Sequence, residues 1–408
     1  MQGMYTMAVA ADLKRDVDEI LPGVVADRRH LHEHPELGMQ EYETARFVVE
    51  RLTALGVEDI RTGISETGVT GLVRGTGDGP GKDKVVLVRA DMDALPIEEE
   101  NDVEYRSKHA GVMHACGHDA HTSILLGVAR ILMERRDSFA GTVKLCFQPC
   151  EETGPGGAKW MIEQGVVDDP KVDACFGLHV WQNEPVGYVL VGDGAVMAAS
   201  DRFTIRIQGK GGHGAMPNHC VDPIVVGMEI VGALQTLVSR EVDPTRSAVV
   251  TVGEFHAGHA PNVIPDTAEI SGTVRSFDPE VRDLLERRIM ELSEGVGAAM
   301  RAEVTAEYRR GVPATVNDPA MADIARQAAI EVVGEDHVRP QIPTMGGEDF
   351  SFFLEATPGC YFFVGTNNEE RGLVWGHHHP RFDIDEEALG IGVEAMVRTV
   401  TGYLAQEA

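Results

Sequence analysis

The stretch KVVLVRAD at residues 84–91 decides the fold class of this chain. Its run of four apolar residues is typical of a strand that is buried on both faces, as in a parallel sheet. Further strands are predicted at 142–148 and 173–180, with a helix at about 120–136 between the first two. Strands that alternate with helices form mostly parallel sheets covered on both faces, so the sequence predicts an α/β domain.

The pattern changes after residue 198. Residues 203–208 alternate between apolar and polar side chains, as in a half-exposed antiparallel strand. The elements predicted from there onward follow the order strand, helix, two strands, helix, strand, which is typical of a small ferredoxin-like α+β domain. We therefore predict a discontinuous main domain at 1–198 and 309–408, interrupted by an inserted domain at 199–308.

Composition excludes several classes of function. The 408 residues include 36 Lys and Arg against 65 Asp and Glu, which gives a formal net charge of −29. Such a charge disfavours binding to nucleic acids and to anionic membranes. We expect no transmembrane run and no signal peptide. Six Cys in a chain of this length do not suggest a disulfide framework, so we expect a reducing, cytoplasmic location.

The most informative cluster is MHACGHDAH at residues 113–121. Cys116 and His118 are two residues apart, so in an extended loop both can face one site. A thiolate and an imidazole together suit a borderline or soft divalent ion. A buried Cys among polar residues that cap a helix would fit the same letters, so this cluster alone leaves both interpretations open.

Carboxylates follow two of the predicted strands, at the end where α/β sheets bind ligands. Asp91 and Asp93 share one side of the chain by their spacing of two. Glu151 and Glu152 are adjacent, so one could bind a metal ion while the other takes a proton from water. A solvated acidic loop would fit the Glu pair equally well.

Histidines complete the pattern. His179 ends the strand predicted at 173–180, where a packed core His is the alternative, and three consecutive His occupy 377–379. Cys, His and Glu residues thus gather at the carboxyl ends of strands in one predicted domain. Together they indicate the site of a metal-dependent hydrolase.

Nine segments resemble the metal-dependent aminoacylase/carboxypeptidase family, in its amidohydrolase branch with the hippurate hydrolases and auxin-conjugate hydrolases. They follow the order of that family nearly from end to end. The segments are RRHLHEHPELG (28–38), RADMDALPIEE (89–99), MHACGHDAHT (113–122), FQPCEETGPGGAKWMIEQG (147–165), FGLHV (176–180), GKGGHGAMPNHCVDPI (209–224), APNVIPDTAEISGTVRSFD (260–278), GGEDFSFF (346–353) and HHPRFDIDEEAL (378–389).

The resemblance implies a hydrolase with two divalent metal ions per subunit that cleaves N-acyl amino acids, such as N-acetyl or benzoyl conjugates, to a carboxylic acid and a free amino acid. Zinc, manganese, cobalt and nickel all suit such ligands. Glu151 would be the general base and then the acid that protonates the leaving amine, and Asp93 would orient a ligand or the base. The implied metal ligands, with Cys116 in the bridging position, are Cys116, His118, Glu152, His179 and His378.

The inserted domain would be a lid that pairs subunits through its sheet edge, in a homodimer or homotetramer. His213 would reach into a neighbouring subunit's site and stabilise the oxyanion. Asn262 would share that task, and Arg275 would bind the substrate carboxylate. Cys150 departs from the family, which usually has a small residue there, and we expect it to pack. The alternatives are a dipeptidase or carboxypeptidase of the wider family and a non-catalytic ligand-binding protein.

Overall fold

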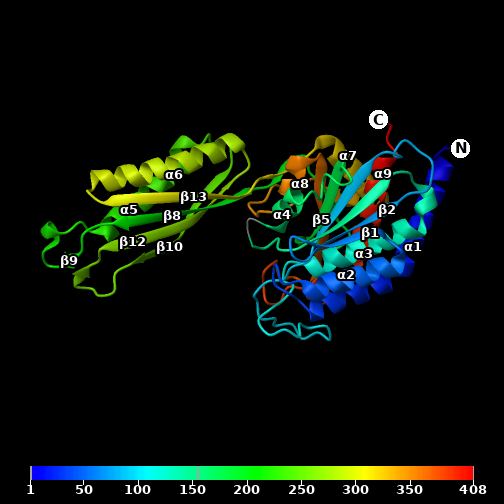
Figure 1. Ribbon diagram of the computed structural model, residues 1–408, viewed down its shortest axis with the longest axis horizontal. Coiled ribbons are helices and arrows are strands. Elements are labelled where there is room, and N and C mark those ends of the chain that lie inside the picture. The colour runs from blue at the N-terminus through cyan, green and yellow to red at the C-terminus, as the bar shows by residue number, and fades with distance from the viewer. Residues whose placement is uncertain (1, 154–155, 408) are drawn as a thin grey trace. The chain divides into compact units, whose positions relative to one another are not determined.

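The computed structural model describes residues 2–153 and 156–407, so Gly154 and Pro155 of the Glu-pair motif lie outside the described residues. The chain forms two compact units (Figure 1). The first comprises Met1–Val196, Val316–Ile342 and Asp349–Ala408, and the second comprises Met197–Thr315 and Pro343–Glu348. These bounds differ from the proposed domain limits because the last strand of the second unit runs past residue 308 and because residues 343–348 return to that unit.

An eight-stranded mixed sheet forms the centre of the first unit. In spatial order its strands are β1 (Glu58–Ile64), β2 (Gly68–Arg74), β4 (Thr142–Gln148), β3 (Val85–Asp91), β5 (Ala174–Pro185), β16 (Gly359–Asn367), β6 (Val189–Leu190) and β15 (Val338–Arg339). Strands β4, β3, β5 and β16 run parallel to one another. Strand β2 pairs antiparallel with β4, and β1 pairs antiparallel with β2. Residues 86–88 of β3 are at most 2 % exposed, which accounts for their apolar sequence. The predicted mixed, mostly parallel sheet is confirmed.

Helices cover both faces of this sheet. One layer contains α1 (Gln2–Glu33), α2 (Tyr42–Leu55), α3 (His118–Glu134), α7 (Pro319–Val333) and α9 (Glu387–Leu404), which contact one another in a chain. The short helices α4 (Gly157–Glu163) and α8 (Ser351–Ala356) contact each other and lie across the sheet from α3 (Figure 1). Gly127 of α3 has no room for a Cβ against Val24 and Val393, so α3 lies close to both α1 and α9.

The second unit has a four-stranded antiparallel sheet with two helices. The strand order is β10 (Ala248–Ala257), β12 (Thr267–Ser276), β8 (Ala199–Gln208) and β13 (Glu303–Val312). Helices α5 (Pro223–Thr236) and α6 (Pro279–Ala299) pack their apolar sides on it. Asp222 and Asp278 cap the two helices by accepting hydrogen bonds from backbone N–H groups of the first turn. The predicted ferredoxin-like order is confirmed.

Shorter elements complete the described chain. They are strands β7 (Gly194–Met197), β9 (Gly212–His213), β11 (Val263–Ile264) and β14 (Thr315–Asn317), the 3₁₀ turns Arg136–Ser138, Pro217–His219, Glu335–His337 and Glu369–Arg371, and the π-helical turn Leu237–Glu241.

The segment Pro223–Glu241 has the length and hydropathy of a membrane-spanning helix, contrary to the expectation of no transmembrane run. A third of it is buried, and core helices of soluble proteins meet the same criteria. Its residues Val226, Ile230 and Leu234 lie in the core of the second unit.

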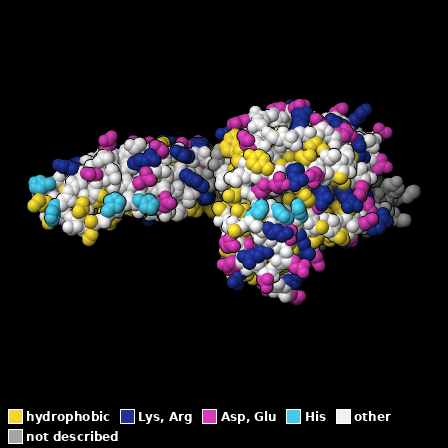
Figure 2. All heavy atoms as spheres, turned by 60° about the horizontal axis from the view of Figure 1, so that its bottom comes forward, with side chains coloured by type: hydrophobic (Ala, Val, Ile, Leu, Met, Phe, Trp, Pro, Cys, Tyr) yellow, Lys and Arg dark blue, Asp and Glu magenta, His cyan; other side chains and the backbone are white. Residues whose placement is uncertain are grey.

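Charged side chains of both signs are interspersed on the face drawn in Figure 2. Surface pairs such as Arg206 with Glu269 and Arg310 with Glu286 lie within ion-pair distance. On that face the acidic side chains are therefore not gathered into one acidic patch.

Candidate metal centre

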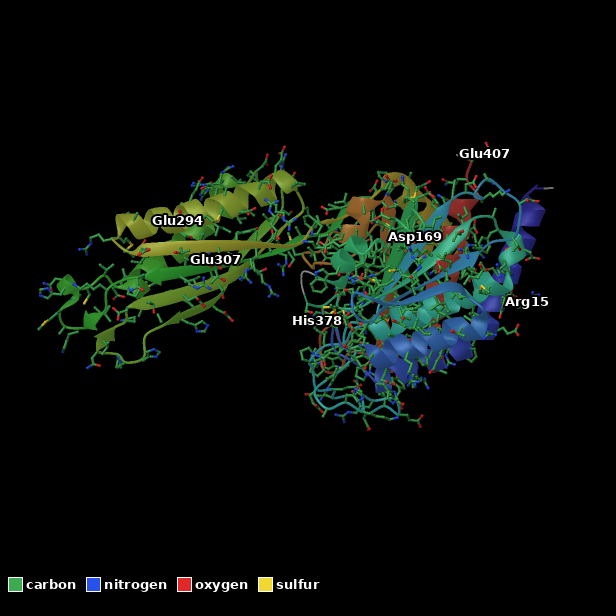
Figure 3. All side chains as sticks on the ribbon, viewed as in Figure 1. Arg15, Asp169, Glu294, Glu307, His378 and Glu407 are labelled. Atoms are coloured by element: carbon green, nitrogen blue, oxygen red, sulfur yellow. The ribbon has the colours of Figure 1, made fainter. Side chains whose placement is uncertain are left out.

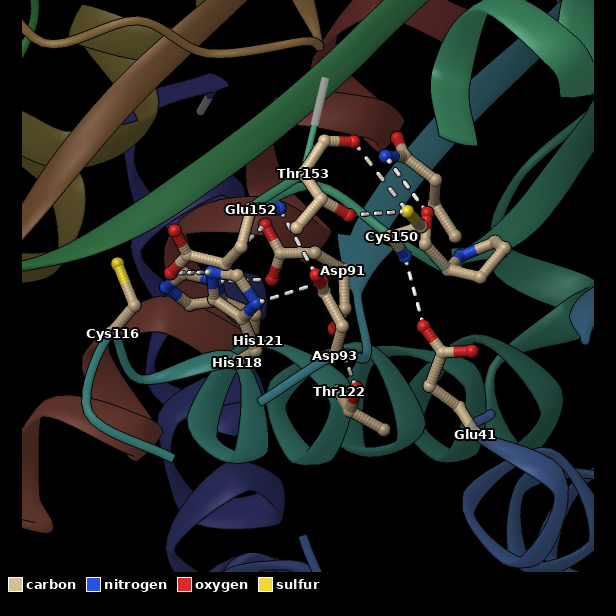
Figure 4. Close-up of polar contacts among 12 residues, drawn as sticks. Glu41, Asp91, Asp93, Cys116, His118, His121, Thr122, Cys150, Glu152 and Thr153 are labelled. Carbon is tan, nitrogen blue, oxygen red and sulfur yellow. Dashed lines mark hydrogen bonds and ion pairs between the residues drawn. The ribbon is translucent and has the colours of Figure 1, made fainter. Parts of the chain in front are cut away.

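The metal ligands implied by the sequence come together in the first unit. Figure 4 shows Cys116, His118 and Glu152 among them. Glu151 and Glu152 follow β4, and Cys116 and His118 lie at the start of α3. His378, labelled in Figure 3, lies in the loop after β16. The sequence predicted that the strand carrying His179 ends near that residue. This bound is wrong, because β5 continues to Pro185, paired with β16.

Two groups of ligand atoms share one thiol. The ligand atoms of Cys116, His118 and His179 lie within 4.8 Å of one another. Those of Cys116, Glu152 and His378 satisfy the same condition. A ligand common to two adjacent groups would suit the two ions of a dinuclear metal site.

The protein alone leaves polar atoms of this cluster unsatisfied. Among the described residues, His118 Nε2 is buried without a hydrogen-bond partner, and buried Glu152 Oε1 has no well-aligned hydrogen bond, only an ion-pair contact with His378. Leaving such groups unpaired is costly, and both are ordinary metal-binding atoms. The mixture of thiolate, imidazole and carboxylate fits borderline divalent ions such as zinc, so the residues present fit the implied metal pair.

Electrostatics also favour a cation here. Burial raises the pKa of the Cys116 thiol far above its usual value, and the charges of Glu152 and Glu151 raise it further. Burial alone would lower the pKa of His118, but Asp91 and Asp93 outweigh it and raise that pKa to about 10. The nearby carboxylates therefore favour positive charge in the cluster, and a bound cation would take the place of the protons on Cys116 and His118.

Asp93 supports two of the implied ligands at once. Its Oδ1 lies 3.2 Å from His118 Nδ1, and its Oδ2 accepts the backbone N–H of Glu152 at 3.0 Å. With Nδ1–H directed to the carboxylate, the free Nε2 of His118 faces the site. This is the carboxylate–histidine arrangement that orients metal ligands in proteins.

A hydrogen bond to the neighbouring backbone sets the tautomer of His179. Its Nδ1 lies 2.5 Å from the carbonyl oxygen of Val180, to which it donates, and its Nε2 lies 3.5 Å from Cys116 Sγ. Burial holds the pKa of His179 well below the usual value, with His121 and His377 adding to the effect. The ring is thus neutral, with a lone pair toward the thiol.

Of the three consecutive histidines, His378 brings a ring nitrogen to the cluster, 3.3 Å from Glu152 Oε1. His377 is half-buried, its ring packs against Trp181 and Phe382, and its Nε2 accepts the backbone N–H of Gln182 at 3.2 Å. His379 stacks on Trp375.

Sequence reasoning gave no role to His121 or Arg89. His121 Nδ1 donates to Asp91 Oδ1 at 2.6 Å, while its Nε2 accepts the N–H of Val180 at 2.9 Å. Arg89 donates to the other oxygen of Asp91 at 2.6 Å. Although Asp91, His118 and His121 lie close enough to bind an ion, both ring nitrogens of His121 are occupied. His121 instead fixes β5 beside His179.

A buried ionic cluster supports the start of α3 from behind. Arg28, which is fully buried, donates to Asp119 at 2.8 Å and to Asp383 at 2.7 Å. His32 also contacts Asp119, at 2.8 Å. Burial would lower the pKa of His32, but Asp119 and Glu99 raise it to about 9. Arg28 and His32 belong to the sequence segment 28–38, which resembles the family. Only the fold shows that this cluster joins α1 to the segments that carry His118 and His378.

The three candidates from the inserted segment lie in the second unit. His213 in β9 pairs with Val263 of β11, and the neighbouring Gly214 N–H donates to Asn262 O at 2.9 Å. Arg275 is half-buried near the far end of β12 and donates to the Thr273 hydroxyl. It lies eight positions along β12 from Thr267, which corresponds to about 27 Å. One copy of this unit therefore brings His213 and Asn262 together but not Arg275.

Comparison with known proteins agrees with this geometry. A protein-family model described as "Peptidase family M20/M25/M40" matches residues 87–402. Thermostable carboxypeptidase 2 of Saccharolobus solfataricus is 41% identical over 394 residues, 95% of this chain and 97% of that protein. N-acetyl-L-cysteine deacetylase of Bacillus subtilis is 43% identical over 366 residues, which are 90% of this chain and 84% of that protein.

A solved structure has the same architecture. The Bacillus subtilis YXEP protein, described as a dinuclear metal binding peptidase from the M20 family, superposes with a TM-score of 0.82 at 35% identity and covers 95% of this chain and 99% of that one. Fold, sequence and the arrangement of ligand atoms agree, and the chain belongs to peptidase family M20/M25/M40.

Proposed function

We propose that the protein is a metal-dependent amidohydrolase that cleaves N-acyl amino acids to a carboxylic acid and a free amino acid. The observation that carries this proposal is the pair of ligand groups that share Cys116, with Glu151 beside them. The name of the Bacillus subtilis relative, N-acetyl-L-cysteine deacetylase, supports this class of substrate.

In this proposal two divalent ions are held by the five side chains around the shared thiol, which are Cys116, His118, Glu152, His179 and His378. When bound, the ions supply Lewis acidity, which polarises an amide carbonyl and makes water easier to deprotonate. The ligand atoms of Glu151, His118 and Glu152 lie within 4.8 Å of one another. Glu151 then accepts a proton from the attacking water and returns it to the departing amine. Asp93 holds His118 and the backbone of Glu152 in place.

A substrate panel tests this function. The metal-stripped protein is reconstituted separately with zinc, manganese, cobalt and nickel, and release of free amino acid is measured from N-acetyl amino acids, hippurate and dipeptides. We expect the metal-free protein to be inactive and a divalent ion to restore hydrolysis of the N-acyl substrates. Hydrolysis restricted to dipeptides would favour the peptidase alternative, and tight binding without hydrolysis would favour the ligand-binding alternative.

We further propose that two copies pair through the second unit, in a homodimer or homotetramer. The edge strand β10 exposes Phe255 (37 %), and α5 exposes Val225 (45 %) and Met228 (62 %), which together form an apolar surface beside an open sheet edge. The separation of Arg275 from His213 also supports pairing, because one small substrate can meet both only if they come from different copies.

Mixing two inactive variants tests the role of His213 across subunits. Glu151→Gln supplies an intact His213, and His213→Ala supplies an intact Glu151. After equal amounts are unfolded and refolded together, half of the dimers are mixed, and each has one complete site. We expect about one quarter of the wild-type activity per subunit. No recovery, with mixed dimers demonstrated by mass, would contradict a role for His213 in the partner's site.

We also propose a cytoplasmic location, because all six cysteines are free, as in proteins kept in a reducing compartment.

A further inference from the structure

Glu41 is a buried carboxylate whose side chain leaves its own helix. It is the N-cap residue of α2 and is 0 % exposed, yet its side chain makes no capping bond. Glu36 takes over the capping task, since its carboxylate accepts the N–H and hydroxyl of Thr44, both at 2.9 Å. The carboxylate of Glu41 is therefore free to serve another segment.

That segment is the loop that carries the two glutamates. Glu41 Oε1 accepts the backbone N–H of Cys150 at 2.9 Å, as drawn in Figure 4, and Oε2 accepts the hydroxyl of Thr67 at 2.6 Å. Both oxygens are thus engaged, and Thr67, just before β2, fixes the direction of the carboxylate. Burial raises the pKa of Glu41 to about 7, so the group is held in this place against a desolvation cost.

Cys150 requires such support because of its backbone. Its φ is +59°, in the left-handed region that residues with a Cβ rarely adopt. Its carbonyl accepts the N–H of Gly157 at 2.9 Å, and Gly38 approaches it so closely that a Cβ there would lie 3.2 Å from its Cα. The conformation of Cys150 sets the direction in which the chain enters Glu151.

We propose that Glu41 is a positioning residue for Glu151, because its bond to the Cys150 N–H holds the left-handed turn that directs Glu151 to the metal ligands. This inference rests on the proposed role of Glu151 as the base. Strained backbone persists at functional sites where the surroundings over-determine it, and the buried carboxyl group of Glu41 is part of those surroundings. A displacement of about 1 Å in a catalytic group can cost on the order of 10²-fold in rate.

The test uses the metal-loaded full-length protein and the variants Glu41→Ala and Glu41→Gln. We expect Glu41→Ala to lower kcat by about 10²-fold, with KM and the metal content per subunit near the wild-type values. Amide hydrogen exchange at Cys150 should accelerate. Glu41→Gln keeps an oxygen for the Cys150 N–H and an N–H₂ group for Thr67, so it should retain most of kcat and the slow exchange.

Two further variants keep the test decisive. Glu36→Ala removes the cap of α2 without touching Cys150, and we expect it to lower stability but not kcat. Cys150→Gly, added to Glu41→Ala, should recover part of kcat, because glycine adopts positive φ without the steric penalty.

Unchanged kcat in Glu41→Ala, despite faster exchange at Cys150, would overturn the positioning role and leave the proposed function intact. Loss of metal from Glu41→Ala would also overturn it, because Glu41 would then support the ligands rather than the base. Failure of the proposed function is a separate result, since the wild-type protein itself would then release no amino acid from the panel.

Discussion

The Glu151→Gln variant is expected to hydrolyse N-acyl amino acids about 10³-fold more slowly than the wild type while binding the same amount of metal. Glutamine has the size and shape of glutamate but cannot accept the proton that the attacking water must lose. Glu152, not Glu151, lies in the ligand group with Cys116 and His378, so the metal pair should survive the change. The measurements are kcat for an N-acetyl amino acid and the metal content per subunit.

Glu163→Gln is the matched control, because Glu163 lies exposed on the nearby helix α4 and undergoes the same chemical change. It should leave both quantities unchanged. Full activity in Glu151→Gln would show that another group takes the proton. Loss of metal would show that Glu151 is a ligand.

Arg28→Met is expected to lower the free energy of unfolding by about 3–5 kcal/mol, a large part of the stability of a typical domain. Arg28 is fully buried and contacts Asp119, Asp383 and, at 3.4 Å, Glu386. Methionine fills much of the volume but leaves buried carboxylates without their cation. Urea unfolding of the two proteins, followed by a signal from the first unit, measures the difference.

The adjacent Arg29 is the control. It is 43 % exposed and pairs with Glu386 at 2.6 Å, so Arg29→Met should cost no more than about 1 kcal/mol. Equal losses of unfolding free energy in the two variants would show that the buried Arg28 pairs stabilise the protein no more than the exposed Arg29 pair does.

The Arg28 effect should also depend on pH. Burial would raise the pKa of Asp119 and Asp383, but Arg28 outweighs it and holds both below the ordinary value. A carboxyl whose pKa is lowered by folding contributes stability that is complete above its unfolded pKa of about 4 and is lost as the pH falls further. The difference between wild type and Arg28→Met should therefore be largest near neutral pH and shrink in acid.

Much of the fold could be predicted because its elements have strong local patterns. The run at 84–91 is apolar since β3 is covered on both faces, and the helix predicted at 120–136 differs from α3 by two residues at each end. Strand β1 was missed because its residues are polar and mostly exposed, so they carry no strand pattern. Strands β6 and β15 have two residues each, which is too short for any periodicity.

The candidate site could be predicted to the extent that its residues follow strands in sequence. The positions of Cys116, His118, Glu152 and Asp93 made them candidates, the family resemblance implied their roles, and the fold places them together. Contacts between residues far apart in the sequence could not be predicted, and Arg28 and Asp119 are 91 residues apart. The left-handed backbone of Cys150 was invisible as well, because a cysteine gives no signal for it.

The position of β16 within the central sheet also bears on how the protein is made. This strand, Gly359–Asn367, lies between β5 and β6, although nearly nine-tenths of the chain precedes it. A growing chain can complete nearly all of the second unit early, but β5 keeps an open hydrogen-bonding edge until β16 has been synthesised. Open edges of this kind invite wrong pairing between nascent chains. The same late segment brings His378, so a chain that stops short of it can neither close its sheet nor complete the proposed metal centre.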